Sequence, residues 1–167
     1  MPNQTPTYKW PWPLGTDRVM DGDNAMGSLA QAIEATVKLL PINPGVMSPS
    51  SSFAAPTGTP TAIPGMSYTV SPSQSELWVM AAVLDWNWSG ADPGAMVGQL
   101  AVDGAIVRTG NLGILLAGGT RAPMFLLHAQ TYAAGSHTVE ARAGKSASSG
   151  VCNVTTPSLL LVLRFPR

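Results

Sequence analysis

The sequence of 167 residues is long enough for one well-buried domain with an appendage, and too short for two full-sized domains. Nine basic and nine acidic residues give a formal net charge of zero, so nucleic acid is not an expected partner, because it attracts a basic excess. Charged residues make up only 11% of the chain while hydrophobic residues make up 45%, which predicts a surface largely covered by copies of the same chain or by neighbours.

Residues 1–20 are expected to form an extended arm, because prolines at positions 2, 6, 11 and 13 disfavour helical geometry. Three aromatic side chains alternate with these prolines: Tyr8, Trp10 and Trp12. Exposed rings are costly in water, so we expect the arm to anchor on another protein through them. The alternative is an arm that folds back onto its own domain. No basic stretch precedes an apolar run, so no signal peptide is expected.

A helix is predicted within residues 21–41. Residues 21–24 offer acidic and amide side chains suited to an N-cap, residues 25–40 contain no proline, and Pro41 closes the segment. The core-type heptad positions are occupied by Met26, Leu29, Ile33, Thr36 and Leu40. This narrow seam predicts a short coiled coil that oligomerises the chain; the alternative is a helix packed on its own domain.

Residues 42–75 are rich in Pro, Ser, Thr and Gly and almost free of charge. Such a composition predicts a strap without a packed helix, within which residues 65–70 are expected to open a first strand. Because the strap carries apolar side chains, we expect it to lie against the sandwich or a neighbouring subunit, with contacts at Met47, Phe53, Ile63 and Met66.

Residues 76–167 have the pattern of an antiparallel β-sandwich, jelly-roll-like, which makes the fold class mainly β. The apolar run at residues 77–84 is typical of a central strand buried on both faces. Asp103 and Gly104 form a strong hairpin signal between strands expected at residues 95–102 and 105–108. Further strands are expected at residues 123–131, 137–143 and 158–165. No apolar stretch is long enough to span a bilayer, so membrane insertion is not expected.

Two stretches resemble proteins of known families. Residues 13–26, PLGTDRVMDGDNAM, resemble the N-terminal segments of small virion proteins from tailed phages of actinobacteria, many of them minor tail or fibre proteins. Residues 100–104 and 134–142 are similar to the compact sandwiches of C1q/TNF type, which are commonly trimeric. The resemblance implies a virion location, assembly in the host cytoplasm and a trimeric β-sandwich head.

No residue set predicts catalysis, a cofactor or a metal site. Two histidines, His128 and His137, are too few for a histidine-based metal site, and His128 is expected in the core or at an interface. Asp21 and Asp23 are expected to cap the helix, because the glycine and glutamate of a calcium loop are missing.

Trp86 and Trp88 are the remaining candidates for a ligand surface. Alternate residues of a strand share one face, so exposed rings here would stack on a glycan or a partner. The alternative is that both rings fill the sandwich or a subunit interface. The Cys152 thiol is expected to be a small buried hydrophobe.

The sequence therefore predicts a non-catalytic structural virion protein, a homotrimer that contacts other virion proteins. Its expected place is a minor tail or appendage, anchored by residues 1–20. Two alternatives remain open at this point. One is a capsid decoration protein that stabilises the shell, and the other is a carbohydrate- or receptor-binding module that contacts a host surface glycan.

Overall fold

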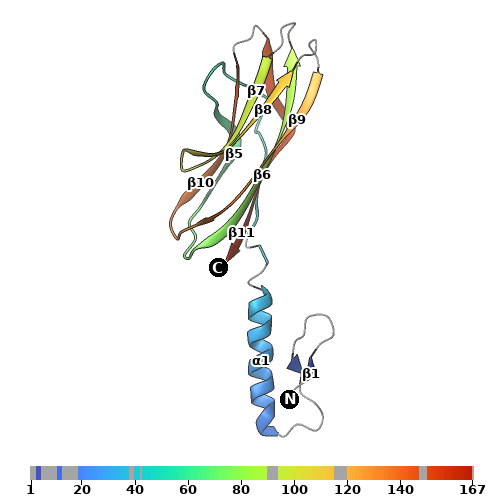
Figure 1. Ribbon diagram of the computed structural model, residues 1–167, viewed down its shortest axis with the longest axis vertical. Coiled ribbons are helices and arrows are strands. Elements are labelled where there is room, and N and C mark those ends of the chain that lie inside the picture. The colour runs from blue at the N-terminus through green and yellow to red at the C-terminus, as the bar shows by residue number, and fades with distance from the viewer. Residues whose placement is uncertain are drawn as a thin grey trace. The chain divides into compact units, whose positions relative to one another are not determined.

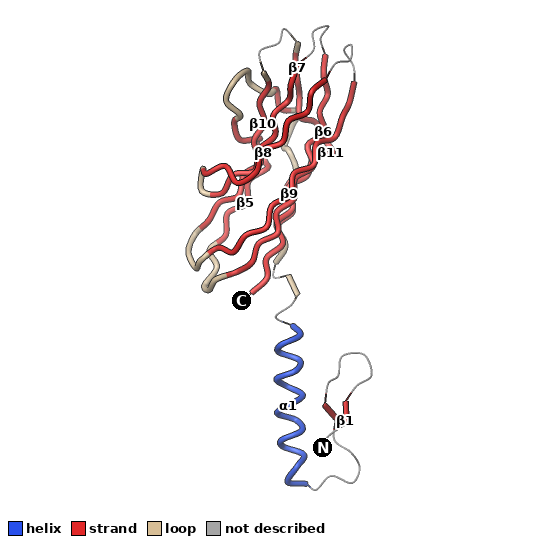
Figure 2. The backbone as a smooth tube through the Cα atoms, in the orientation of Figure 1, coloured by secondary structure: helices blue, strands red, loops and turns tan. Residues whose placement is uncertain are grey.

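The computed structural model describes residues 3–4, 11–12, 19–37, 40–41, 43–89, 94–114, 120–146 and 150–166. The chain divides into two compact units, Met1–Pro41 and Ile42–Phe165. Figure 1 traces their helix and strands, and Figure 2 separates them by type of secondary structure.

In the N-terminal unit, two short strands, β1 (Asn3–Gln4) and β2 (Pro11–Trp12), pair antiparallel. Helix α1 (Val19–Val37) follows. It begins earlier than expected, so Asp21 and Asp23 lie within its first turns and not at the N-cap. Negative charge in the first turn suits the helix dipole, which is a physical reason for the earlier start. Leu40 lies beyond the helix end, where its N–H donates to the Val37 carbonyl at 3.0 Å.

The second unit is a sandwich of two antiparallel sheets, so the predicted fold class is confirmed. One sheet has the order β5 (Thr61–Val70), β10 (His137–Lys145), β7 (Gly94–Val102) and β8 (Ala105–Ile114). The other has the order β3 (Gly45–Met47), β11 (Val151–Pro166), β6 (Glu76–Ser89) and β9 (Thr120–Tyr132), with β4 (Phe53–Ala54) also pairing with β11. We call them the four-stranded and the five-stranded sheet.

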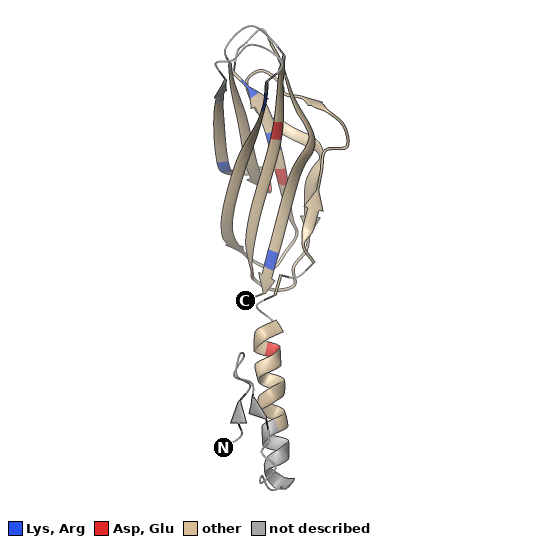
Figure 3. Ribbon diagram, turned by 90° about the vertical axis from the view of Figure 1, so that its right-hand side faces the viewer, with Lys and Arg blue, Asp and Glu red and all other residues tan. Residues whose placement is uncertain are grey.

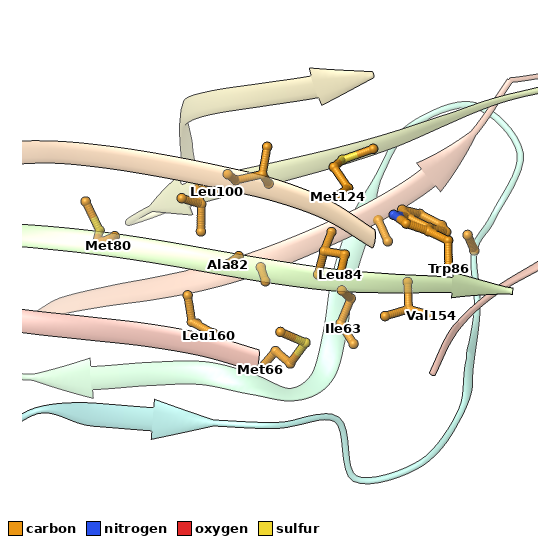
Figure 4. Close-up of a cluster of buried hydrophobic side chains, with 14 of the residues drawn as sticks. Ile63, Met66, Met80, Ala82, Leu84, Trp86, Leu100, Met124, Val154 and Leu160 are labelled. Atoms are coloured by element: carbon orange, nitrogen blue, oxygen red, sulfur yellow. The ribbon is translucent and has the colours of Figure 1, made fainter. Parts of the chain in front are cut away.

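The core lies between the two sheets. Along β6 every second side chain is buried, from Trp78 to Trp88, as the two-residue period of a strand requires. Figure 4 shows Met80, Ala82, Leu84 and Trp86 of β6 in one cluster with side chains of both sheets, among them Leu100, Met124 and Leu160. Glycines make room where the layers are closest: a Cβ on Gly98 would lie 2.5 Å from the Met124 sulfur.

Residues 43–75 belong to the sandwich and are not a separate strap. They supply β3 and β4, which pair with β11, and β5, which pairs with β10. Ile63 and Met66 are fully buried, and Met47 and Phe53 pack against the core. The sandwich therefore begins before Glu76, the expected boundary, because pairing with β10 and β11 forms strands in a segment whose prolines and low charge predict a loop-rich strap. The first strand expected at residues 65–70 lies within β5.

The turn between β7 and β8 forms at Asp103 and Gly104, as expected. Both residues have positive φ, 52° and 80°, the conformation that a two-residue hairpin turn requires. The turn places Val102 opposite Ala105 at the start of the hairpin.

Candidate self-association surface

The outward face of the five-stranded sheet is apolar. On β6 the side chains between the buried positions point outward, and four in succession are apolar and half-buried: Leu77, Val79, Ala81 and Val83. Strand β11 repeats the pattern, since Ser158, Leu160, Val162 and Arg164 are buried while the intervening positions are Leu159, Leu161, Leu163 and Phe165. A strand with apolar side chains on both sides is expected to be shielded from water on both sides.

Strands β9 and β3 extend this apolar area to both edges of the sheet. Phe125 is 72% exposed and lies opposite Val83, and Leu127 is 64% exposed and lies opposite Ala81. At the other edge Val46 is 61% exposed and pairs with Leu161. We call the whole area the apolar outer face; its members are Val46, Leu77, Val79, Ala81, Val83, Phe125, Leu127, Ala129, Leu159, Leu161, Leu163 and Phe165.

One end of the apolar outer face carries a compact polar cluster. Arg121 Nη2 lies 2.8 Å from Asp85 Oδ2 and donates to Thr155 Oγ1 at 2.9 Å. The Thr155 hydroxyl in turn donates to Asp85 Oδ2 at 3.0 Å. These groups satisfy one another, so the cluster marks the polar limit of the apolar area.

The outward face of the four-stranded sheet is different. Its centre carries Glu140 and Arg142, whose side chains are joined by two hydrogen bonds of 2.8 and 3.1 Å. At its side the Thr69 and Thr138 hydroxyls hydrogen-bond at 2.9 Å. These polar pairs distinguish this face from that of the five-stranded sheet, although Ile106 on β8 is 54% exposed. Figure 3 shows how few charged residues the sandwich carries.

The seam predicted on the helix is largely exposed in this chain. Met26 is 65% exposed, Ile33 39% and Leu40 59%, while Leu29 and Thr36 are half-buried. The Thr36 hydroxyl donates to the Ala32 carbonyl at 2.8 Å, a bond within the helix. A further apolar side chain, Val37, is 56% exposed. Within the described part of the chain, most of the seam is therefore exposed.

The remaining predicted site residues have different outcomes. Tyr8 and Trp10 lie outside the described residues, and of Trp12 only its place in β2 is described. Trp86 and Trp88 share one face, but both are fully buried in the core. The hypothesis that they form a ligand surface is therefore wrong, and their alternative role as filling of the sandwich is correct. His137 begins β10, and the half-buried His128 hydrogen-bonds Gln130 at 3.0 Å.

Sequence analysis missed the apolar outer face, although it noted the signal. The unbroken apolar runs in β6 and β11 were interpreted as strands covered on both sides within one domain. In the sandwich each of these strands has one covered side and one open side. The most exposed members, Phe125 and Leu127, flank the buried Leu126 in the sequence. All three are apolar, and they differ in burial only because their side chains point to opposite faces of the sheet.

A buried ion pair was also missed, because its partners lie 88 residues apart. Arg164 Nε and Nη2 donate to the two oxygens of Glu76 at 2.8 and 2.9 Å, and Trp78 Nε1 donates to Oε2 at 2.9 Å. Burial raises the pKa of Glu76, but the hydrogen bonds from Arg164 and Trp78 outweigh it and hold that pKa below its ordinary value. The pair joins β6 to the end of β11 inside the sandwich.

Within the described part of the chain, no three metal-ligating side chains gather into a group. Among the same residues, no helix has the length and apolar character needed to cross a bilayer. Burial raises the pKa of the Cys152 thiol to about 12, which keeps it protonated and unreactive at neutral pH.

No family model matches the sequence, and no curated protein matches it either. Among solved structures, the Eiger TNF of S. frugiperda aligns with a TM-score of 0.50 at 10% identity, covering 75% of this chain and 93% of that one. A chain of infectious bursal disease virus, Gt strain, aligns at a TM-score of 0.45 and 17% identity, over 74% of this chain and 32% of its own. The dimeric latent PorU of Porphyromonas gingivalis aligns at 0.38 and 10%, over 77% and 13%. The similarity to Eiger TNF shows a shared TNF-like β-sandwich fold.

Proposed function

We propose that this chain is a non-catalytic structural protein of a virion, and that it assembles as a homotrimer through the apolar outer face of its five-stranded sheet. The exposure of Phe125 and Leu127 on edge strand β9, beside the apolar outward side chains of β6, is the observation that carries the proposal. A soluble monomer rarely exposes such a contiguous apolar area, because each large apolar side chain left in water forgoes roughly 1.5 to 3 kcal/mol of burial.

The occupant of this face is a second copy of the chain. The outward side chains of the paired residues at the centre of β6 and β9 carry no charge, so the surface that binds this face is expected to be apolar and uncharged as well. The chain presents that surface itself, and a face buried against its own copies gives a closed, symmetric assembly. The exposed side chains Met26 and Ile33 on α1 support the same association in a short three-stranded coiled coil.

The virion role rests on the resemblance of residues 13–26 to phage virion proteins, and the TNF-like sandwich is compatible with it. In this role the protein is a minor tail or appendage protein that residues 1–20 anchor to another virion protein, and the sandwich takes part in host attachment. The closest alternative is a capsid decoration protein with the same fold and a different anchoring partner. No observation favours a glycan ligand once Trp86 and Trp88 lie in the core.

Incorporation into particles tests the proposal. The full chain should co-purify with intact particles, and with tails after heads and tails are separated. A chain lacking residues 1–20 should remain a soluble oligomer but fail to incorporate. Recovery with empty heads would replace the tail assignment by capsid decoration, and normal incorporation of the shortened chain would show that the anchor lies elsewhere.

A further inference from the structure

Three connections of the sandwich are hydrogen-bonded to one another. They are residues 71–75 between β5 and β6, the turn at Asp103 and Gly104, and residues 133–136 between β9 and β10. The Gly135 N–H donates to the Pro72 carbonyl at 3.0 Å, and the Ser75 hydroxyl donates to the Tyr132 carbonyl at 3.2 Å. Asp103 is bound to β10 through the Thr138 backbone, which donates to Oδ1 at 2.8 Å.

His137 links two of these connections through both of its ring nitrogens. Nδ1 lies 2.7 Å from Asp103 Oδ2, and Nε2 lies 3.1 Å from the Ala133 carbonyl oxygen. Both partners are acceptors only, so each nitrogen needs a proton to form its bond. The imidazolium supplies two N–H donors, whereas the neutral ring supplies one and presents a lone pair at the other nitrogen.

We propose that His137 is a proton-dependent latch that holds residues 133–136 closed when its ring is charged and loosens them when the ring is neutral. On deprotonation the ring keeps its proton on Nδ1, because a lone pair facing the Asp103 carboxylate costs more than one facing a neutral carbonyl. The bond to the Ala133 carbonyl is therefore the one lost. The device does not depend on the proposed virion role.

The described groups around the ring keep their own charge states near neutrality. Hydrogen bonds from His137 and from the Thr138 N–H hold the pKa of Asp103 below its ordinary value, so this carboxylate stays charged at neutral pH. Tyr132 lies 5.6 Å from the His137 ring, and burial, then the Asp103 charge, raises its pKa above 10, so it stays neutral.

The ring of Trp78, from β6, also packs against His137, edge-on at 5.6 Å. Trp78 is uncharged, and its own N–H is bound to Glu76, which is paired with Arg164. Glu76 is held ionised by that pairing, so neither group changes charge near neutrality. None of these described neighbours of the ring therefore changes charge near neutrality.

Amide hydrogen exchange at Gly135 tests the latch in the full chain, because this N–H closes residues 133–136 onto Pro72. After correction for the intrinsic pH dependence of exchange, protection should fall roughly five-fold between pH 6 and 8.5, the effect of one lost hydrogen bond. The His128→Gln variant should keep this dependence, because the bond of His128 in the described part of the chain is to Gln130, away from residues 133–136. The His137→Gln variant should lose it.

Two results would overturn the proposal: Gly135 protection that does not change with pH, or a pH dependence that survives in His137→Gln. If the His137→Gln variant fails to fold, nitrogen NMR of the His137 ring in the wild-type protein tests the latch independently by showing which ring nitrogens carry protons. Both ring nitrogens should carry protons at pH 6, and the neutral ring should be protonated on Nδ1 at pH 8.5. A neutral ring protonated on Nε2 would contradict the latch.

Discussion

Replacing Arg164 by methionine should lower the free energy of unfolding at pH 7 by about 3–5 kcal/mol, the usual cost of stranding one partner of a buried ion pair. The side chains of Arg164 and Glu76 are only 8% and 4% exposed, so water cannot replace the guanidinium. After the change, Glu76 keeps one described donor, the indole N–H of Trp78. A buried carboxylate with one hydrogen bond is far less stable than one with three.

The assay is urea unfolding followed by fluorescence, at one fixed protomer concentration because association contributes to stability. The pH dependence identifies the cause. In the Arg164→Met variant the guanidinium no longer offsets the rise that burial causes in the pKa of Glu76, so Glu76 takes up a proton more readily. The deficit relative to the wild type should therefore shrink as the pH falls from 7 towards 5.

The double variant Glu76→Gln with Arg164→Met is the matched control. It buries no charge, so it should be more stable at pH 7 than Arg164→Met alone, and its deficit should not depend on pH over this range. A loss below about 1 kcal/mol in Arg164→Met, or a deficit that stays constant with pH, would refute the argument that a buried charge is left uncompensated.

Three further predictions concern the sandwich. Gly98→Ala should lower stability by about 1–3 kcal/mol in thermal unfolding, because its Cβ would lie 2.5 Å from the Met124 sulfur; an unchanged melting temperature would show that the sheets can separate there. The lowered pKa of Asp103 contributes stability that is full above the ordinary carboxyl pKa and is lost as the pH falls through the lower folded value, so the stability difference between wild type and Asp103→Asn should be full above about pH 4 and shrink as the pH falls further. The Cys152 thiol, with a pKa of about 12, should react with a thiol reagent at pH 8 only after denaturant is added, and rapid labelling of the native protein would contradict its burial.

Strand positions could be predicted from the sequence wherever pattern and turn chemistry agreed. Asp103 and Gly104 located the β7–β8 hairpin, because few residue pairs adopt positive φ together. Of the strands before Glu76, the one expected at residues 65–70 lies within β5. Strands β3 and β4 were not predicted, since they are stabilised by pairing with β11, far along the chain. That stabilisation leaves no local pattern.

The candidate surface shows a different limit. The apolar content of β6 indicated that both of its faces would be buried. The sequence does not show which face is buried by the chain itself and which by another molecule. Trp88 and Phe125 are both large and aromatic, yet one is fully buried and the other is 72% exposed. Their roles separate only when the register of β6 and β9 assigns each side chain to a face.

A charge placed on the apolar outer face is the sharpest variant for testing assembly. Phe125 is 72% exposed in the chain, so Phe125→Asp should leave the sandwich folded while placing a carboxylate in the proposed interface. Thr109→Asp is the matched control, because Thr109 is exposed on β8, opposite Gln99, on the outward face of the four-stranded sheet.

The mass of the full chain in solution, measured by light scattering at micromolar concentration, tests the central claim most directly. The proposal predicts three times the protomer mass of 17.3 kDa for the wild type and for Thr109→Asp, and a smaller, folded species for Phe125→Asp. A wild-type protein that is folded and stable at 17.3 kDa would contradict the account, and so would a Phe125→Asp variant that keeps the full trimeric mass.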